Sequence, residues 1–235
     1  MSEQTRTPLV KICGIREPEH ALVALEAGAD MIGLVFAKSP RRLTVEGGKA
    51  VAGAVREADP DRNLKIVGLF VNETHELMNE VAHEVGLDRI QLSGDEPASI
   101  VNRLRVPAIG SIRIDSENRQ AAINRLGDWM LVFPWAVIVD AHVPGIYGGT
   151  GTVGDWSLAS HFANRFPLIL AGGLNSDNVA DAIQKVRPFA VDVSSGVETE
   201  GVKDSEKIRA FIAAAKATSY DIVPPSNSQT IGRRT

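Results

Sequence analysis

Cys13 is the only cysteine of the chain, and its chemistry is versatile because a thiolate acts as a base or as a nucleophile. It closes the short apolar run Leu9–Cys13, which predicts a β-strand, and Gly14 follows it. A helical pattern begins soon afterwards, near Pro18–Ala27. Ligands of parallel sheets bind where the strands end, so Cys13 is placed for catalysis. A lone cysteine is otherwise more often a small buried apolar residue, so the choice between the two interpretations depends on the residues around it.

Other polar side chains fall at or just after the ends of predicted strands. Arg41, beside Arg42, follows the second strand. Two adjacent arginines are typical of a solvated surface, but at a strand end the planar guanidinium suits a carboxylate through two parallel hydrogen bonds. Gln91 and Ser93 share one face of the fourth strand, where they need partners or line a site. Asp140 closes the sixth strand, where a carboxylate either caps the following turn or belongs to a site formed with the next loop.

Glycine-rich stretches follow the last three predicted strands. Such stretches leave backbone N–H groups accessible, and these groups bind anions. Each stretch alone fits a tight turn, but their co-occurrence after three successive strands is typical of barrels that hold a phosphate there. The stretches are Gly148–Gly151, Ala171–Gly173 and Asp192–Gly196.

Eight apolar segments rich in β-branched residues alternate with stretches of helical periodicity. Neighbouring parallel strands need crossover connections, so this alternation predicts an α/β fold with a parallel sheet, and eight repeats fit a single closed (β/α)8 TIM barrel. Glycines inside the strands, Gly33, Gly68 and Gly110, are expected to face a crowded barrel interior. Strands are expected at Leu9–Cys13, Met31–Phe36, Lys65–Val71, Arg89–Ser93, Ala108–Ile112, Ala136–Asp140, Leu168–Ala171 and Ala190–Val193. Helices are expected near Pro18–Ala27, Val45–Ala58, His75–Val85, Ala98–Leu104, Glu117–Leu126, Trp156–Ala163, Ser176–Val186 and Lys203–Ala217.

The barrel is expected to occupy residues 9–217, because no linker or change of composition divides the chain. Residues 1–8 are polar and lack the apolar core of a signal peptide, so a disordered lead-in is expected there. From Thr218 onward the pattern gives way to serine, proline, asparagine and arginine. Residues 218–235 are therefore expected to form a disordered tail.

The composition excludes several classes of function. A formal net charge of -4 offers no basic surface for nucleic acid. The single cysteine rules out an internal disulfide framework and fits a reducing compartment, so the protein is expected in the cytoplasm. The five histidines show no metal-ligand spacing, and no structural metal is expected. The longest apolar run, Met130–Val139, is interrupted by Pro134 and falls far below the ~20 residues that cross a bilayer, so no membrane contact is expected.

Motifs at the strand ends, taken as a set, carry a specific resemblance. They are Lys11–Gly14, Gly33–Phe36 with Lys38–Arg41, Gly68–Asn72, Gln91–Leu92 with Gly94–Glu96, Asp140 with Gly148–Gly151, Ala171–Leu174 and Arg187–Glu198. This set closely resembles the phosphoribosylanthranilate isomerases, a family of (β/α)8-barrel enzymes of tryptophan biosynthesis. The resemblance extends from about Val10 to Lys216, which is nearly the whole chain.

The resemblance implies an Amadori rearrangement of a phosphorylated small molecule, N-(5-phosphoribosyl)anthranilate, to 1-(2-carboxyphenylamino)-1-deoxyribulose 5-phosphate, with no cofactor. It implies Cys13 as the general base, Asp140 as the general acid and Arg41 as the residue that binds the anthranilate carboxylate. Many members carry a histidine where this chain has Ser93. The implied phosphate-binding loops contain Gly149, Gly172, Gly173, Ser194 and Ser195, with Asp192 beside them, and Gln91 is also assigned to the substrate.

Two alternatives stay open. One is another phosphate-binding barrel enzyme, of the sugar-phosphate epimerase or thiamine-phosphate synthase type. Metal-dependent epimerases need several histidines and carboxylates at strand ends, and His142 is the only histidine near a strand end. Indole-glycerol-phosphate synthase needs a catalytic lysine inside the barrel, whereas Lys11 and Lys65 lie on strands but not at their ends. The other alternative is a non-catalytic barrel that binds a phosphorylated ligand, which the presence of both Cys13 and Asp140 disfavours. A monomer or a homodimer is expected.

Overall fold

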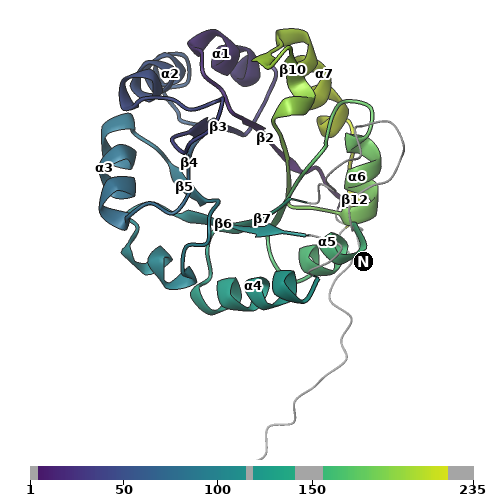
Figure 1. The fold of residues 1–235 in the computed structure, drawn as a ribbon. Coiled ribbons are helices and arrows are strands. Elements are labelled where there is room, and N and C mark those ends of the chain that lie inside the picture. Colours follow the sequence, from purple (N-terminus) through teal and green to yellow (C-terminus); the bar gives the residue numbers. More distant parts are fainter. Residues whose placement is uncertain (1–4, 115–118, 141–155, 222–235) are drawn as a thin grey trace, which may run out of the picture.

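The computed structural model describes residues 5–114, 119–140 and 156–221, which form a closed barrel of parallel strands inside a ring of helices (Figure 1). Strands that follow one another along the chain are hydrogen-bonded neighbours, and the last pairs with the first to close the barrel. The predicted TIM barrel is therefore confirmed. Its strands are β2 (Leu9–Cys13), β3 (Met31–Val35), β4 (Lys65–Phe70), β5 (Arg89–Leu92), β6 (Ala108–Arg113), β7 (Ala136–Asp140), β8 (Leu168–Ala171) and β9 (Ala190–Val193).

Most helices of the outer ring lie close to where the periodicity predicts them. They are α1 (Pro18–Glu26), α2 (Val45–Ala58), α3 (His75–Val85), α4 (Arg119–Val132), α5 (Trp156–Ala163), α6 (Val179–Val186) and α7 (Ser205–Lys216). Threonine side chains fix two of the starting points, because Thr44 accepts a hydrogen bond from the backbone N–H of Gly47, and Thr74 accepts one from Leu77. Among the helices that the structure describes, none is long and apolar enough to span a membrane.

Three helix expectations differ from the structure in informative ways. Residues 98–103 form a 3-10 helix, η1 (Ala98–Arg103), instead of an α-helix. Helix α4 runs past the expected end at Leu126, because Trp129 is fully buried and its indole Nε1 donates to the Ser111 carbonyl at 3.1 Å. Helix α6 starts later than expected, since the side chain of Asn175 accepts hydrogen bonds from the backbone N–H groups of residues 177 and 178 and holds a turn there.

The glycines inside the strands do not all face the barrel interior. Only Gly33 does so, next to Cys13. Gly68 and Gly110 face the helices, where an added Cβ would lie 2.3 Å from Leu87 and 2.5 Å from the Trp129 ring. The interior expectation is therefore wrong for these two, which make room for large side chains between the sheet and the helices.

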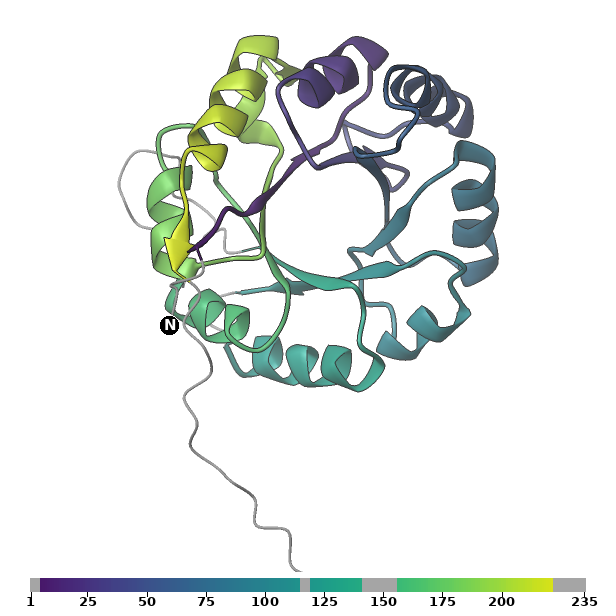
Figure 2. The same cartoon turned by 180° about the vertical axis from the view of Figure 1, so that it is seen from behind.

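The two ends of the described chain pair with each other outside the barrel. Strand β1 (Thr5–Arg6) runs antiparallel to β12 (Tyr220–Asp221), as Figure 2 shows from behind. Tyr220 is buried, and its hydroxyl donates to the Pro188 carbonyl at 2.7 Å. This pairing differs from the disorder expected for Thr5, Arg6, Tyr220 and Asp221. Residues 1–4 and 222–235 of the two segments expected to be disordered lie outside the described residues.

A buried ion pair lies across the seam where the barrel closes. Lys11 on β2 and Asp192 on β9 are register partners, and the lysine Nζ lies 2.9 Å from the aspartate Oδ1. The Lys11 side chain is 0% exposed. Burial alone would lower the pKa of Lys11, but the negative charge of Asp192 raises it above its ordinary value, so the lysine stays protonated. Two compensating charges therefore stand inside the barrel.

Removing one of these charges should destabilise the fold. Lys11→Met leaves the Asp192 carboxylate buried without its partner, which should lower the free energy of unfolding by about 3–5 kcal/mol. Urea titration measures this loss. The double variant Lys11→Met/Asp192→Leu should regain most of it, because neither charge is left unpaired. Lys65→Met is the matched control, since Lys65 lies on β4, away from the seam, and its ammonium donates to the Arg62 carbonyl at an exposed position. Equal stability of Lys11→Met and the wild type would contradict this account of the seam.

Candidate active site

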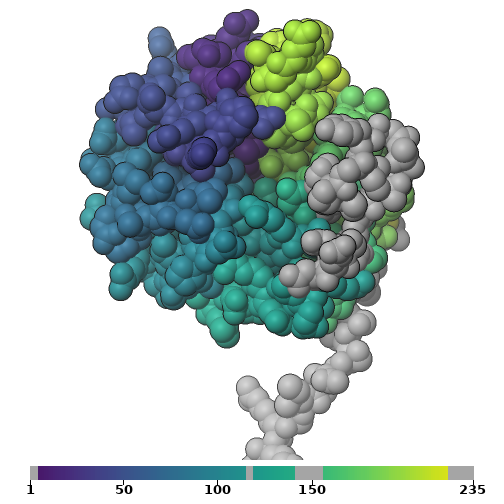
Figure 3. All heavy atoms as spheres, in the orientation of Figure 1, coloured from purple at the N-terminus to yellow at the C-terminus, as the bar shows by residue number. Residues whose placement is uncertain are grey.

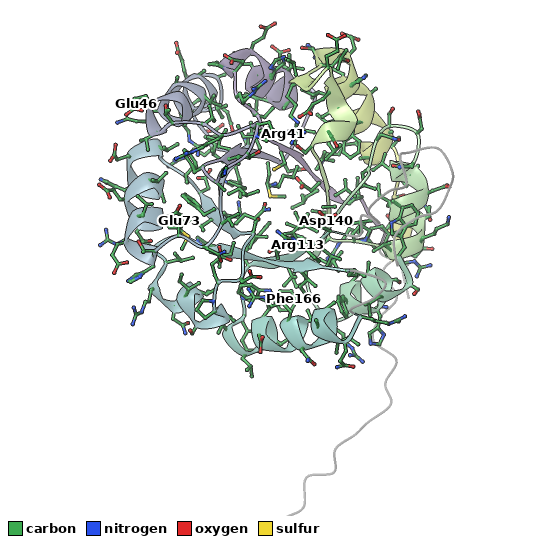
Figure 4. The ribbon with its side chains drawn as sticks, in the orientation of Figure 1. Arg41, Glu46, Glu73, Arg113, Asp140 and Phe166 are labelled. Carbon is green, nitrogen blue, oxygen red and sulfur yellow. The ribbon has the colours of Figure 1, made fainter. Side chains whose placement is uncertain are left out.

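A cavity of about 300 Å³ opens at the carboxyl ends of the barrel strands. Figure 3 shows the molecule in space-filling form, and Figure 4 labels Arg41 on one side of the barrel with Asp140 and Arg113 across from it. The structure brings together at this cavity seven of the residues singled out from the sequence: Cys13, Arg41, Gln91, Ser93, Asp140, Asp192 and Ser194. It also adds residues that were not singled out, chiefly Lys38, Ser39, Ser111 and Arg113.

Cys13 ends β2 at the floor of this cavity and is 6% exposed. The chain turns directly after it, because Gly14 has a φ of +80°, and the Gly14 N–H donates to the Gly33 carbonyl at 2.9 Å. Burial raises the pKa of the thiol above its ordinary value, and the positive charge of Lys11 opposes that rise. The free thiol is therefore largely protonated at neutral pH.

Lys11, which sequence analysis placed on a strand but did not assign to the site, lies beside the Cys13 thiol. It lies two positions before Cys13, so both side chains face the barrel interior. Gly33 on the neighbouring strand has no side chain in the way: an added Cβ would lie 2.8 Å from the Cys13 Sγ and 3.1 Å from the Lys11 Nζ. The sequence feature that could have indicated this position was a lysine inside an apolar strand, two residues before the cysteine.

Asp140 closes β7 at the exposed rim of the cavity. Its register partner on β6 is Arg113, which also lines the cavity and donates from Nη2 to the Ser93 carbonyl at 3.2 Å. Sequence analysis missed Arg113 because it ended this strand one residue early. The glycine-rich loop that follows Asp140, with Gly149, lies outside the described residues.

Arg41 does not stand alone at the opposite rim. Its Nε donates to Glu198 Oε1 at 2.7 Å, and its Nη2 donates to Glu198 Oε2 at 2.6 Å. Lys203 reaches the same carboxylate, with its Nζ 2.7 Å from Oε1. Glu198 stood within a recognised motif but carried no assigned role, because a contact over this sequence distance leaves no local pattern.

Gln91 offers an acceptor to the cavity. Its side chain is buried, and its amide Nε2 donates to the Ser93 hydroxyl at 3.0 Å. Among the described residues, its Oε1 has no hydrogen-bond partner. Buried polar atoms are normally satisfied, so this oxygen is placed to accept a hydrogen bond from a ligand.

The described part of the expected phosphate region lies beside the cavity. After β8, Gly172 and Gly173 have φ values of +96° and +63°, a backbone shape that favours glycine. After β9, Ser194 lines the cavity, and Ser195 begins the short 3-10 helix η2 (Ser195–Val197). Gly172 and Ser195 directly follow lining residues, and Gly173 comes next after Gly172, but none of the three lines the cavity itself. Within the described residues, no group of three or more His, Cys, Asp or Glu side chains is arranged to hold a metal ion.

Comparison with known proteins identifies the family. The family model described as N-(5'phosphoribosyl)anthranilate (PRA) isomerase matches residues 10–214. The chain belongs to this family. The N-(5'-phosphoribosyl)anthranilate isomerase of Roseiflexus castenholzii is 50% identical over 216 residues, which cover 90% of this chain and 99% of that protein. This chain is thus an isomerase of the tryptophan pathway, and the alternative barrel functions are not favoured.

Solved structures agree with this assignment. The phosphoribosyl anthranilate isomerase of Thermotoga maritima is 39% identical, with a TM-score of 0.77 over 89% of this chain and 99% of that one. An isomerase structure in complex with reduced 1-(o-carboxyphenylamino)-1-deoxyribulose 5-phosphate is 36% identical, with a TM-score of 0.75 over 89% of this chain and 99% of that chain. A thiamine phosphate pyrophosphorylase from Pyrococcus furiosus, 19% identical with a TM-score of 0.60 over 90% of this chain and 96% of that chain, shares the fold alone.

Filling the space at Gly33 should damage the site without unfolding the protein. Gly33→Ala would push its methyl group against the Cys13 Sγ and the Lys11 Nζ. Because a displacement of about 1 Å at a reacting group can cost on the order of 10²-fold in rate, kcat should fall by about 10- to 100-fold. Steady-state kinetics and circular dichroism measure both effects. Gly53→Ala is the control, since a Cβ at Gly53 meets no atom within 4 Å; similar kcat values for the two variants would show that the thiol tolerates displacement.

Proposed function

We propose that this isomerase converts N-(5-phosphoribosyl)anthranilate in the cavity at the strand ends, with Cys13 as the general base and Asp140 as the general acid. One observation carries the proposal: both side chains line the same cavity of about 300 Å³. They come from β2 and β7, which are not neighbours in the sheet, so they approach a bound molecule from different sides.

The two groups match the proton transfers of an Amadori rearrangement. Asp140 delivers a proton to the furanose ring oxygen, the C1′–O bond breaks, and the anilino nitrogen forms an iminium with C1′. The Cys13 thiolate then removes the proton from C2′, and the electron pair of that bond forms the enolamine. Tautomerisation moves a proton from the C2′ hydroxyl to C1′ and yields the ketone. Each placed proton transfer typically contributes ~10²–10⁴ in rate.

Lys11 supports the base in this scheme. Burial disfavours the thiolate, while the ammonium of Lys11 beside it favours the thiolate. Asp192 holds Lys11 in place through the 2.9 Å ion pair and keeps it charged. A thiol with a raised pKa is a strong base once it is ionised. Burial therefore makes the Cys13 thiolate more basic, while the ammonium of Lys11 helps the thiol to ionise.

The remaining residues of the site bind the substrate. Arg41 binds the anthranilate carboxylate, and the unpartnered Oε1 of Gln91 accepts a hydrogen bond from a ribose hydroxyl or the anilino N–H. The phosphate lies against the loops after β7, β8 and β9, where Gly149, Gly172, Gly173, Ser194 and Ser195 contribute. The positive φ values of Gly172 and Gly173 support the part of this assignment that the structure describes.

The broader setting follows from the same proposal. The ligand is a phosphorylated small molecule and not a nucleic acid, in keeping with the net charge of -4. The protein acts in the cytoplasm, where its single cysteine stays reduced. It acts as a monomer or a homodimer; a Thermotoga maritima isomerase is described as dimeric.

Substitution of the acid and of the base tests the mechanism. Cys13→Ser should lower kcat by about 10²–10⁴-fold with little change in KM, because a hydroxyl is a much poorer proton acceptor than a thiolate. Asp140→Asn should lower kcat to a similar extent, since an amide cannot donate the required proton. The decrease of substrate fluorescence follows turnover. Near-wild-type kcat in either folded variant would remove that residue from the mechanism.

Alkylation measures the ionisation of Cys13 directly, because the chain has no other cysteine. Burial raises the thiol pKa, so the rate of reaction with iodoacetamide should rise with pH about a midpoint above the ordinary value of about 8.5. The urea-unfolded chain, where the thiol is exposed, serves as the reference. Inorganic phosphate or substrate should protect the folded enzyme. A folded midpoint at or below that of the unfolded chain would contradict the effect of burial.

A further inference from the structure

Among the described residues, the hydrogen bonds of the Arg41 guanidinium all go to Glu198, which leaves the other edge of the group without a partner there. A guanidinium has five N–H donors in one plane, and Glu198 engages the edge formed by Nε and Nη2. The edge formed by Nη1 and the second hydrogen of Nη2 has the same fork geometry and suits a second carboxylate. The Arg41 side chain is 28% exposed at the cavity, whereas that of Glu198 is 6% exposed.

Glu198 is itself held by a second cation. It opens β10 (Glu198–Thr199), which pairs with β11 (Val202–Lys203) so that Glu198 and Lys203 face each other. The Lys203 Nζ lies 2.7 Å from Glu198 Oε1 and also donates to the Ser194 carbonyl at 2.8 Å. Burial would raise the pKa of Glu198, but hydrogen bonds from Arg41 and Lys203 lower it to about 2, so the carboxylate stays ionised.

The position of this cluster relative to the thiol is fixed by Gly14. A Cβ at Gly14 would lie 2.5 Å from the Arg41 Cδ, so the arginine stem crosses the backbone next to Cys13 only because this residue is glycine. Arg41, Lys203 and Glu198 together carry one net positive charge. That charge complements one additional carboxylate at the cavity rim.

We propose that Glu198, held by Lys203, is a positioning residue that directs the free edge of Arg41 toward the carboxylate of the substrate. Glu198 thereby sets the preference for an aromatic amine that bears an ortho carboxylate. This inference rests on the role of Arg41 in the proposed function.

Glu198→Gln tests the inference, because glutamine keeps the shape but removes the charge and places an NH2 group where an acceptor stood. KM for phosphoribosylanthranilate should rise at least about tenfold, the equivalent of one charge-assisted hydrogen bond, and kcat should change much less. KM for phosphoribosylaniline, which lacks the carboxylate, should stay the same. Glu84→Gln is the control, since Glu84 forms an exposed pair with Lys49 at 3.5 Å far along the chain from the site.

Glu198→Asp covers the case in which Glu198→Gln does not fold. Aspartate keeps the charge but is one methylene too short for both donors, so a smaller KM rise with the same dependence on the substrate carboxylate is expected. An unchanged KM for phosphoribosylanthranilate, or an equal rise for both substrates, would overturn the inference. A lower KM would also overturn it, because Glu198 would then compete with the substrate for Arg41.

Arg41→Ala separates this inference from the proposed function. If Arg41→Ala leaves KM for phosphoribosylanthranilate unchanged, the assignment of Arg41 to the carboxylate fails and the inference fails with it. If Arg41→Ala raises this KM while a folded Glu198→Gln variant does not, Arg41 binds the carboxylate without help, and only the inference fails. Inhibition by free anthranilate gives a binding readout that does not depend on turnover.

Discussion

The ion pair between Lys11 and Asp192 connects the stability of the barrel to its chemistry. It joins the first and the last barrel strand at the seam, where both charges are shielded from water. Such a pair is costly to bury and more costly to break, which makes closure of the barrel depend on both partners. The same ammonium stands beside the Cys13 thiol and counters the effect of burial on its ionisation. Closure of the barrel and the basicity of the Cys13 thiolate thus depend on the same ion pair.

A second ion pair repeats this connection at the rim. Arg41 follows β3 and Glu198 follows β9, yet their side chains meet through two hydrogen bonds. The floor and the rim of the cavity are therefore each held by a contact between the beginning and the end of the chain. The parts of the site on β5, β6 and β7 need no such contact, because consecutive strands already place Gln91, Arg113 and Asp140 side by side.

Local pattern was sufficient for much of this architecture. Continuous apolar runs such as Leu9–Cys13 and Ala136–Asp140 have the bounds expected from sequence, and the polar residues that close them lie at one cavity. Features that depend on distant partners were not predictable in this way. Nothing near Glu198 indicates that it meets Arg41, and nothing near Tyr220 indicates that its hydroxyl donates to the Pro188 carbonyl. The length of α4 likewise follows from the space that Gly110 leaves for Trp129.

The pairing of β1 with β12 has a topological consequence. These strands lie where the chain enters β2 and where it leaves α7, at the amino ends of the barrel strands and away from the cavity. The points of entry and exit are therefore neighbours on the non-catalytic end of the molecule. A barrel with this geometry is suited to circular permutation and to tandem fusion, because a short linker across this end would leave the mouth of the barrel open to small molecules.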